Sequence, residues 1–456
     1  MKKLLVVLLS LGLIVAFSTA ASAVDVKFGG QYYVTGQYEN NRGLSGEDNT
    51  RSTADIWQRA RVKMVFKVDE GLDFTTQFDM LEKMWGGVNN SDSTNMDRSN
   101  SRKTNIATAV ALQENFEFEQ AYVTFKTGVG LFQIGYQPAG AWGTGFGDEP
   151  NTRPRLLYAI PVGPVTIAAI FEKWYDSVYA TNANGNVFGN YGSADGDMDK
   201  YYLTGTYKLK GAEAGLLFAA YNGRATRTVA GYSIKQQGLA PYLKATFGPV
   251  YVESEFIFNF GHAKEYEVAT VATPDVKATG WGGYALAKMT VGPAYFGASI
   301  GYSTGDDPTT TDKDESGPKS TVSWNPGLIF GDGNYKTWIG GTNVGGTNGA
   351  SFDPGACQNV LAYNVFGGFN PTPKLNIDAQ LWLLQADTVK QAAGPEIVSN
   401  DYGYELDLTA TYKIFDNLTY MVGAGYFWTG DYFKGTNSDN KVGNDYVLLN
   451  KLTLTF

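Results

Sequence analysis

A two-residue alternation in the last twelve residues, 445–456, constrains the fold of this chain more than any other sequence feature. Successive side chains of a β-strand point to opposite faces. One face of this stretch would carry Tyr446, Leu448, Asn450, Leu452, Leu454 and Phe456, and the other Asp445, Val447, Leu449, Lys451, Thr453 and Thr455. The stretch therefore predicts a strand with one mostly apolar face and one mixed face, ending on an aromatic residue.

The same alternation recurs along the chain, for example over 200–209, 250–260 and 402–413, where apolar and aromatic residues alternate with charged and hydroxyl-bearing ones. Beyond residue 23 no apolar run is long enough for a membrane-spanning helix, and the mean hydropathy is −0.22 although 14% of residues are aromatic. A transmembrane barrel needs apolar residues only at alternate positions, so its average hydropathy stays low. The pattern predicts an all-β protein, a transmembrane antiparallel β-barrel with lipid outside and a water-filled lumen.

Tight turns and long polar loops alternate between the expected strands. Most of the turns contain Gly, Pro, Asp or Asn, the residues that tight turns favour. The eight turns are Asp69–Leu72, Thr127–Gly130, Pro161–Pro164, Leu209–Ala212, Phe247–Val250, Val291–Ala294, Asn370–Lys374 and Phe415–Leu418. The nine loops are 40–54, 85–114, 138–151, 176–199, 223–235, 262–278, 304–357, 388–400 and 430–443. These seventeen connections predict about eighteen strands, with short turns on the periplasmic side. Sixteen strands are the alternative, and 304–357 has room for a further hairpin around 335–340.

The N-terminus predicts export. Lys2 and Lys3 precede an apolar run over 4–17, and small residues at 21–23 form a cleavage site, so residues 1–23 are expected to be a signal peptide. The barrel domain would then be 24–456. The only cysteine, Cys357, and the only histidine, His262, exclude an intramolecular disulfide, a C-x-x-C-H haem attachment and most His-based metal sites. We therefore expect no cofactor, no metal and no catalysis, and the net charge of −9 argues against nucleic acid.

The strand expected at 57–68 carries a row of cations on one face. Ala60, Val62, Met64, Phe66 and Val68 form its apolar face, so Arg59, Arg61, Lys63 and Lys67 would point into the lumen. Asp73 and Asp79 would share that lumen on the following strand. Arg59, Arg61 and Lys63 are therefore candidate pore-lining residues.

Two stretches resemble bacterial porins. The run 119–125, a Gly turn and the run 131–137 resemble the strand–turn–strand before the third loop of general diffusion porins, although Thr124 replaces a usual Gly and Tyr136 a usual lumen Arg. Phe456, Leu454 and Leu452 resemble the C-terminal signature of outer-membrane barrels, which the barrel assembly machinery reads, although Asn450 departs from it. The resemblance therefore implies a porin fold and an outer-membrane location.

The resemblance also implies a constriction loop at 138–151. In such porins the third loop folds into the barrel and sets carboxylates opposite a cationic wall. Asp148 and Glu149 would supply the carboxylates here, and Arg153 and Arg155 on the following strand would add to the wall. The alternative is a solvated loop whose acids have no special role, with the two arginines paired locally. Trp382 and Phe427, which also point inward, are read either as stacking platforms for a sugar or as filler against a loop.

The function expected from this resemblance is passive diffusion of small hydrophilic solutes and ions through an outer-membrane porin. The expected partners are outer-membrane lipid and lipopolysaccharide, the assembly machinery and, by analogy, two further copies in a homotrimer. A substrate-selective channel of the same fold is one alternative. A barrel that sheathes a separate partner such as a cytochrome is another. An outer-membrane enzyme is disfavoured because there is a single histidine.

Overall fold

A computed structural model describes residues 25–46, 52–85, 116–175, 196–224, 231–267, 269–270, 273–319, 324, 326–331, 344–353 and 357–456. The predicted signal peptide and the suggested hairpin around 335–340 lie outside these residues. The long strands are β1 (Asp25–Glu39), β2 (Thr53–Asp69), β3 (Leu72–Met84), β4 (Glu117–Thr127), β5 (Gly130–Ala139), β6 (Asn151–Val162), β7 (Val165–Tyr175), β8 (Met198–Leu209), β9 (Ala212–Gly223), β10 (Tyr232–Phe247), β11 (Val250–Tyr266), β13 (Trp281–Val291), β14 (Ala294–Ser303), β18 (Val360–Thr372), β19 (Leu375–Gln385), β20 (Asp401–Phe415), β21 (Leu418–Thr429) and β22 (Asp445–Thr455).

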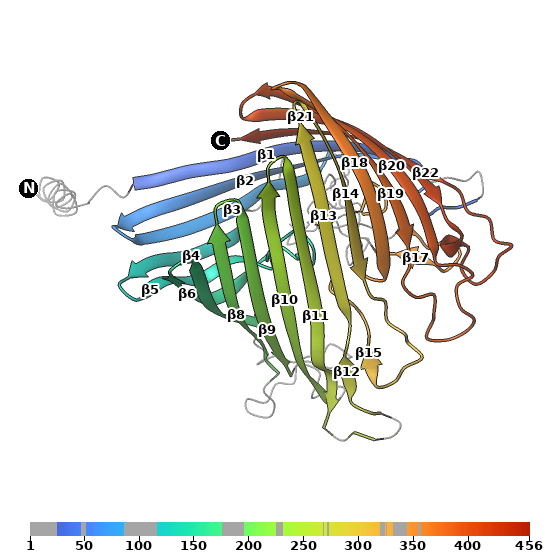
Figure 1. The fold of residues 1–456 in the computed structure, drawn as a ribbon, viewed down its shortest axis with the longest axis horizontal. Helices are drawn as coiled ribbons and strands as arrows, with labels where there is room; N and C mark the ends of the chain where they lie inside the picture. Colours follow the sequence, from blue (N-terminus) through green and yellow to red (C-terminus); the bar gives the residue numbers. More distant parts are fainter. Residues whose placement is uncertain are drawn as a thin grey trace, which may run out of the picture.

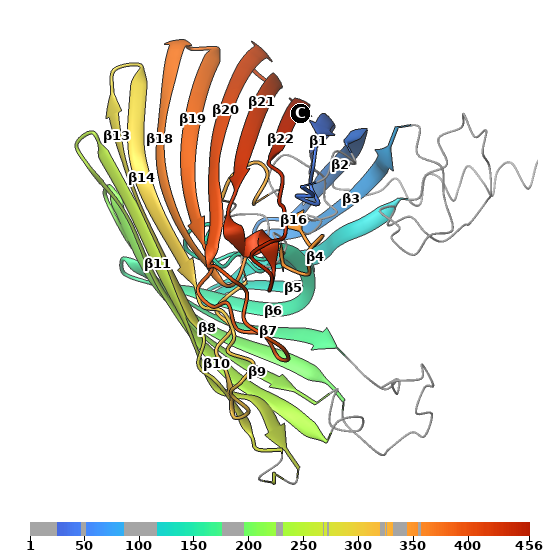
Figure 2. The same cartoon turned by 90° about the vertical axis from the view of Figure 1, so that its right-hand side faces the viewer.

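These eighteen strands form one closed antiparallel barrel (Figures 1 and 2). Each pairs with its neighbours in the chain, and β1 pairs with β22 from Gln31 opposite Thr455 to Glu39 opposite Val447. Closure leaves no long strand with an unpaired edge, as a barrel in lipid requires. The predicted fold and the count of eighteen are confirmed.

Short pieces of secondary structure lie in the loops. β12 (Val276–Ala278) pairs in parallel with β15 (Lys313–Asp314), β16 (Val344–Gly345) pairs with β17 (Ser351–Phe352), and η1 (Asp431–Lys434) is a single 3-10 turn. The described residues include no helix whose length and hydropathy would allow it to cross a bilayer.

All the tight connections lie at one end of the barrel. Two residues separate β2 from β3, β10 from β11 and every other pair joined by a predicted turn. Gly71 and Gly248 adopt φ values of 76° and 58°, which two-residue hairpins favour and which cost glycine little. The long loops follow the other strand ends, so the predicted asymmetry between the two ends is present.

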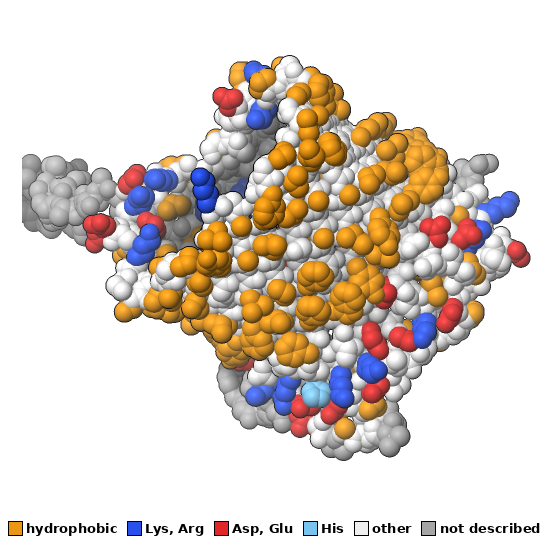
Figure 3. Space-filling view, in the orientation of Figure 1, with side chains coloured by type: hydrophobic (Ala, Val, Ile, Leu, Met, Phe, Trp, Pro, Cys, Tyr) orange, Lys and Arg blue, Asp and Glu red, His pale blue; other side chains and the backbone are white. Residues whose placement is uncertain are grey.

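The outward face is apolar. Figure 3 shows hydrophobic side chains spread across the strands, with charged side chains gathered toward the ends of the strands. The outward residues include Leu203, Leu216, Leu243, Phe256, Phe258, Val365, Leu383, Leu408 and Leu448, all exposed. An apolar belt around a closed barrel is the surface that lipid covers in a membrane.

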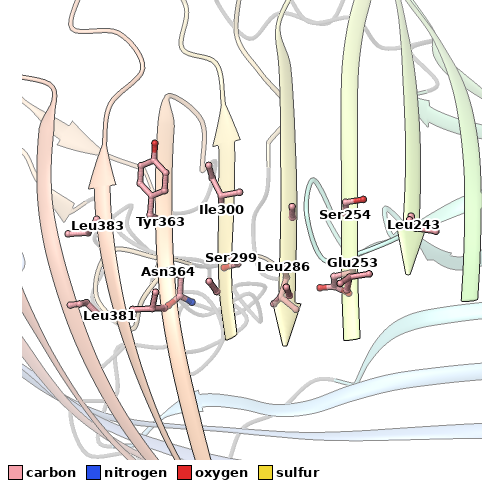
Figure 4. Close-up of a pocket in the computed structure, with 15 residues that line it drawn as sticks. Leu243, Glu253, Ser254, Leu286, Ser299, Ile300, Tyr363, Asn364, Leu381 and Leu383 are labelled. Carbon is pink, nitrogen blue, oxygen red and sulfur yellow. The ribbon is translucent and has the colours of Figure 1, made fainter. Parts of the chain in front are cut away.

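Part of this belt is hollowed. A shallow apolar hollow of about 620 Å³ crosses six neighbouring strands, β10, β11, β13, β14, β18 and β19 (Figure 4). Ser254, Ala285, Ala287 and Ala298 contribute only small side chains there, whereas Leu243 and Leu383 are larger.

The loop end of the barrel interior is packed with apolar side chains. Segments of the loop between β14 and β18 and the turn η1 lie within the ring of strands (Figure 2). Phe330 stacks on Phe352 with ring centroids 3.9 Å apart, and Phe433 of η1 lies 6.1 Å from Phe427. Trp382 and Phe427 are buried in this cluster, which confirms the filler interpretation. The described part of the lumen is therefore lined by polar and charged side chains along part of its length and packed with apolar ones along another.

Candidate functional site in the barrel lumen

The cations of β2 face carboxylates of the neighbouring strand. Arg61 binds Asp79 with two hydrogen bonds, Nε to Oδ1 at 2.6 Å and Nη2 to Oδ2 at 2.5 Å. Arg59 lies 3.6 Å from the same carboxylate and 3.5 Å from Glu82. The register explains this, because Arg61 is directly opposite Asp79. The carboxylates of Asp79 and Glu82 thus offset the charges of the two arginines. Lys63 is the next inward cation along β2.

The loop between β5 and β6 lies against the inner face of β10, β11 and β13. Trp142 donates its indole N–H to the carbonyl of Ala240 on β10 at 2.9 Å. Thr144 donates both its backbone N–H and its hydroxyl to Oε2 of Glu255 on β11, each at 2.7 Å. Phe146 is buried between Tyr284 on β13 and Trp324, at ring centroid distances of 6.0 and 5.2 Å. Three side chains therefore fix the loop to the wall from inside.

A glycine permits this close approach. Gly143 has φ 62°, and a Cβ added there would come within 2.8 Å of Oε2 of Glu255 and of the Tyr242 ring. No other residue combines that backbone conformation with so little volume. The glycine-rich sequence of the loop is thus explained by how closely its backbone follows β10 and β11.

The acidic pair of the loop has separate surroundings. Oδ1 of Asp148 accepts the backbone N–H of Trp142 at 2.8 Å, which braces the loop across its own width. Burial raises the pKa of Asp148 to about 6, while that hydrogen bond and nearby Lys244 oppose the rise. Glu149 closes the loop through its backbone N–H, which donates to Gly140 at 2.8 Å. Asp148 lies near Lys244 on β10, and Glu149 near Lys200 on β8, whereas Arg59 and Arg61 are on β2.

Arg153 and Arg155 project inward from the start of β6. Arg155 Nε lies 3.1 Å from Oε2 of Glu172 on β7, and its Nη1 donates to the carbonyl of Pro138 at 2.7 Å. Arg155 therefore ties the beginning of the loop to the wall. The guanidinium of Arg153 lies over the Trp174 ring, 4.6 Å from its centroid.

Two buried carboxylates on β20 hold a second inward segment, which the sequence reasoning missed. Glu405 accepts the backbone N–H of Ile329 at 2.6 Å and of Phe330 at 2.9 Å, and Asp407 accepts that of Leu328 at 3.2 Å. Gly327 has φ 96°, and a Cβ there would come within 2.6 Å of Glu405. The alternation over 402–413 correctly predicts that both carboxylates point into the lumen. It does not predict that they bind the backbone of a loop.

Comparison by sequence gives no match, either to a family model or to a curated protein. Comparison by structure gives matches over almost the whole chain. OccK8 (OprE) of Pseudomonas aeruginosa is 12% identical, with TM-score 0.51 and coverage of 94% of this chain and 98% of that one. OccAB4 of Acinetobacter baumannii is 11% identical, with TM-score 0.50 and coverage of 96% and 100%. At such identities the likeness shows a shared fold, the porin-type barrel that the sequence resemblance implied.

Proposed function

We propose that this chain is an outer-membrane porin that lets small hydrophilic solutes and ions diffuse passively across the membrane. The observation that carries the proposal is the closed eighteen-strand barrel, apolar outside and charged inside. Such a barrel is wide enough to hold an aqueous channel. Arg61 on β2 and Arg155 on β6 have carboxylate counter-charges within the wall, as a hydrated, ion-conducting lumen allows.

A narrowed, selective channel is the second candidate. The loop 140–150, fixed to Glu255, and the segment 326–331, fixed to Glu405 and Asp407, both occupy lumen volume. Charges beside a narrow waist are screened less than charges in open solvent, so they discriminate between ions. We propose that Asp148, Glu149, Arg153 and Arg155 act at this waist, with Arg59, Arg61 and Lys63 lining the wall elsewhere.

Planar-bilayer recording tests both candidates. Purified, folded protein should give discrete conductance steps, and reversal potentials in a salt gradient should measure the ion preference. Asp148→Asn together with Glu149→Gln should shift the reversal potential toward anion selectivity, and less so at 1 M salt, where the Debye length is about 3 Å. Lys208→Gln, on an exposed ion pair at the short-turn end, is the matched control. Absence of steps from folded protein would overturn the channel function.

The location and assembly belong to the same proposal. We propose export by the predicted signal peptide, insertion by the barrel assembly machinery, and contact of the apolar belt with outer-membrane lipid and lipopolysaccharide. A homotrimer follows from the resemblance alone. Native mass measurement in mild detergent would test it, with a monomeric mass excluding the trimer.

A further inference from the structure

Four inward side chains form a row across β6, β7, β8 and β9. The strand register places Arg155 opposite Glu172, Glu172 opposite Lys200, and Lys200 opposite Tyr221. Glu172 is buried and binds Arg155. Lys200 lies directly opposite Glu172 on the other side but forms no ion pair with it.

Lys200 is nearly buried and has no counter-ion within ion-pair distance among the described residues. The residue is 8% exposed, and among the described residues its ammonium makes no hydrogen bond or ion pair. Its ammonium lies over the Trp174 ring and 4.7 Å from the centroid of Tyr221. Glu149 and Glu172 are close enough to influence it without binding it. An ionisable side chain kept unpaired inside a membrane barrel costs stability and points to a ligand.

Arg153 shares the same indole. Its guanidinium lies 4.6 Å from the Trp174 centroid, and its buried Nε has no partner among the described residues. Two cations thus contact one aromatic ring at the loop end of the inner wall, and each has N–H groups that no carboxylate of the described residues accepts. Among the described residues, the cluster holds three cations, counting Arg155, and two carboxylates, Glu149 and Glu172.

A similar arrangement elsewhere in the lumen shows what is unusual here. Arg59 and Lys451 both lie over Tyr33, at 5.1 and 4.6 Å from its centroid. There, however, Asp79 and Glu82 lie within ion-pair distance of Arg59. At Tyr33 one of the two cations over the ring, Arg59, therefore has carboxylates within ion-pair distance, whereas among the described residues neither Arg153 nor Lys200 at Trp174 has one.

We propose that Arg153 and Lys200 form a binding site for a small multivalent oxyanion of the phosphate or sulfate class. A guanidinium fork matches two oxygens of one oxyanion, and a lysine supplies a point charge beside it. The site deepens the proposed channel function, because it lies on the lumen wall at the loop end. An anion that enters the lumen would bind at this site.

Inorganic phosphate is the probe. In bilayers, phosphate added to a chloride solution should reduce the chloride current of the intact protein in a saturable way. Calorimetry of the folded protein in detergent should show phosphate binding independently of conduction. Lys200→Met and Arg153→Met should each weaken binding about tenfold or more, because each removes a charge-assisted contact. Replacing a buried, unpaired charge by an apolar side chain of similar volume preserves folding.

Lys451→Met is the matched control, since it removes a lumen lysine that also lies over an aromatic ring. It should leave phosphate affinity unchanged. Equal binding by acetate would overturn the multivalent class, and undiminished phosphate binding by Lys200→Met would overturn the site. Phosphate binding without any conductance would retain the site and reject the channel, so the two proposals fail separately.

Discussion

At the scale of single residues, glycines set how closely loops approach the wall. Gly143 and Gly163 have almost the same φ, 62° and 61°, but only Gly143 has neighbours where a Cβ would lie. Because an alanine is strained at a positive φ, substitution by alanine costs about 1 kcal/mol of conformational free energy at either position. If Gly143→Ala has a larger effect on the protein than Gly163→Ala, the excess is therefore due to the contact of the loop with Glu255 and Tyr242.

We predict that Gly143→Ala displaces the loop from the wall and increases both the single-channel conductance and its fluctuations. Gly163→Ala, in a short turn with open space around it, should leave the conductance unchanged. Single-channel recording of the two variants checks this. Identical traces from both would mean that the loop does not limit the pore.

At the scale of elements, buried carboxylates act as receptors for loop backbone. Glu405 uses both of its oxygens on consecutive N–H groups and is fully buried. We predict that Glu405→Gln destabilises the segment 326–331 by about 1–3 kcal/mol, because the amide group turns a donor toward a backbone donor. The segment should become sensitive to protease and the pore should widen.

Asp378→Asn is the matched control for this prediction. Asp378 is also on an inner wall, on β19, but its partners are Tyr295 and Gln380 rather than a loop backbone. It should change neither protease sensitivity nor conductance. If the segment 326–331 is as resistant to protease in Glu405→Gln as in the wild type, the carboxylate does not hold the segment.

How much of these elements the sequence predicts depends on the range of the contact. The alternation places Arg61 and Asp79 on one face of adjacent strands, and they do bind each other. Strand count and turns follow from equally local patterns. By contrast, Thr144 and Glu255 are 111 residues apart, and Ile329 and Glu405 are 76 apart. No periodicity encodes such pairs, because they depend on how the whole barrel brings loops and walls together.

At the scale of the whole molecule, closure depends on the seam between β1 and β22. Gly30 and Phe456 exchange backbone hydrogen bonds, at 2.8 Å from Gly30 N and 3.1 Å from Phe456 N. The Phe456 ring lies over Gly30, where a Cβ would come within 2.6 Å of it. Asn450, the outward residue that departs from the apolar pattern, lies against a second glycine of the seam, Gly36. Glycines on β1 thus make room for side chains of β22.

Two variants separate closure from recognition by the assembly machinery. Deleting Phe456 should lower the outer-membrane level and abolish heat-modifiable migration, because it removes the residue of the seam that pairs with Gly30 and also the proposed signal. Gly30→Ala keeps Phe456 but crowds its ring, so it should lower the temperature of barrel opening while leaving more protein in the membrane than the deletion does.

Phe247→Ala, which changes an exposed aromatic residue away from the seam, is the control and should behave as wild type. Normal levels and migration in the deletion would show that neither closure nor assembly depends on Phe456.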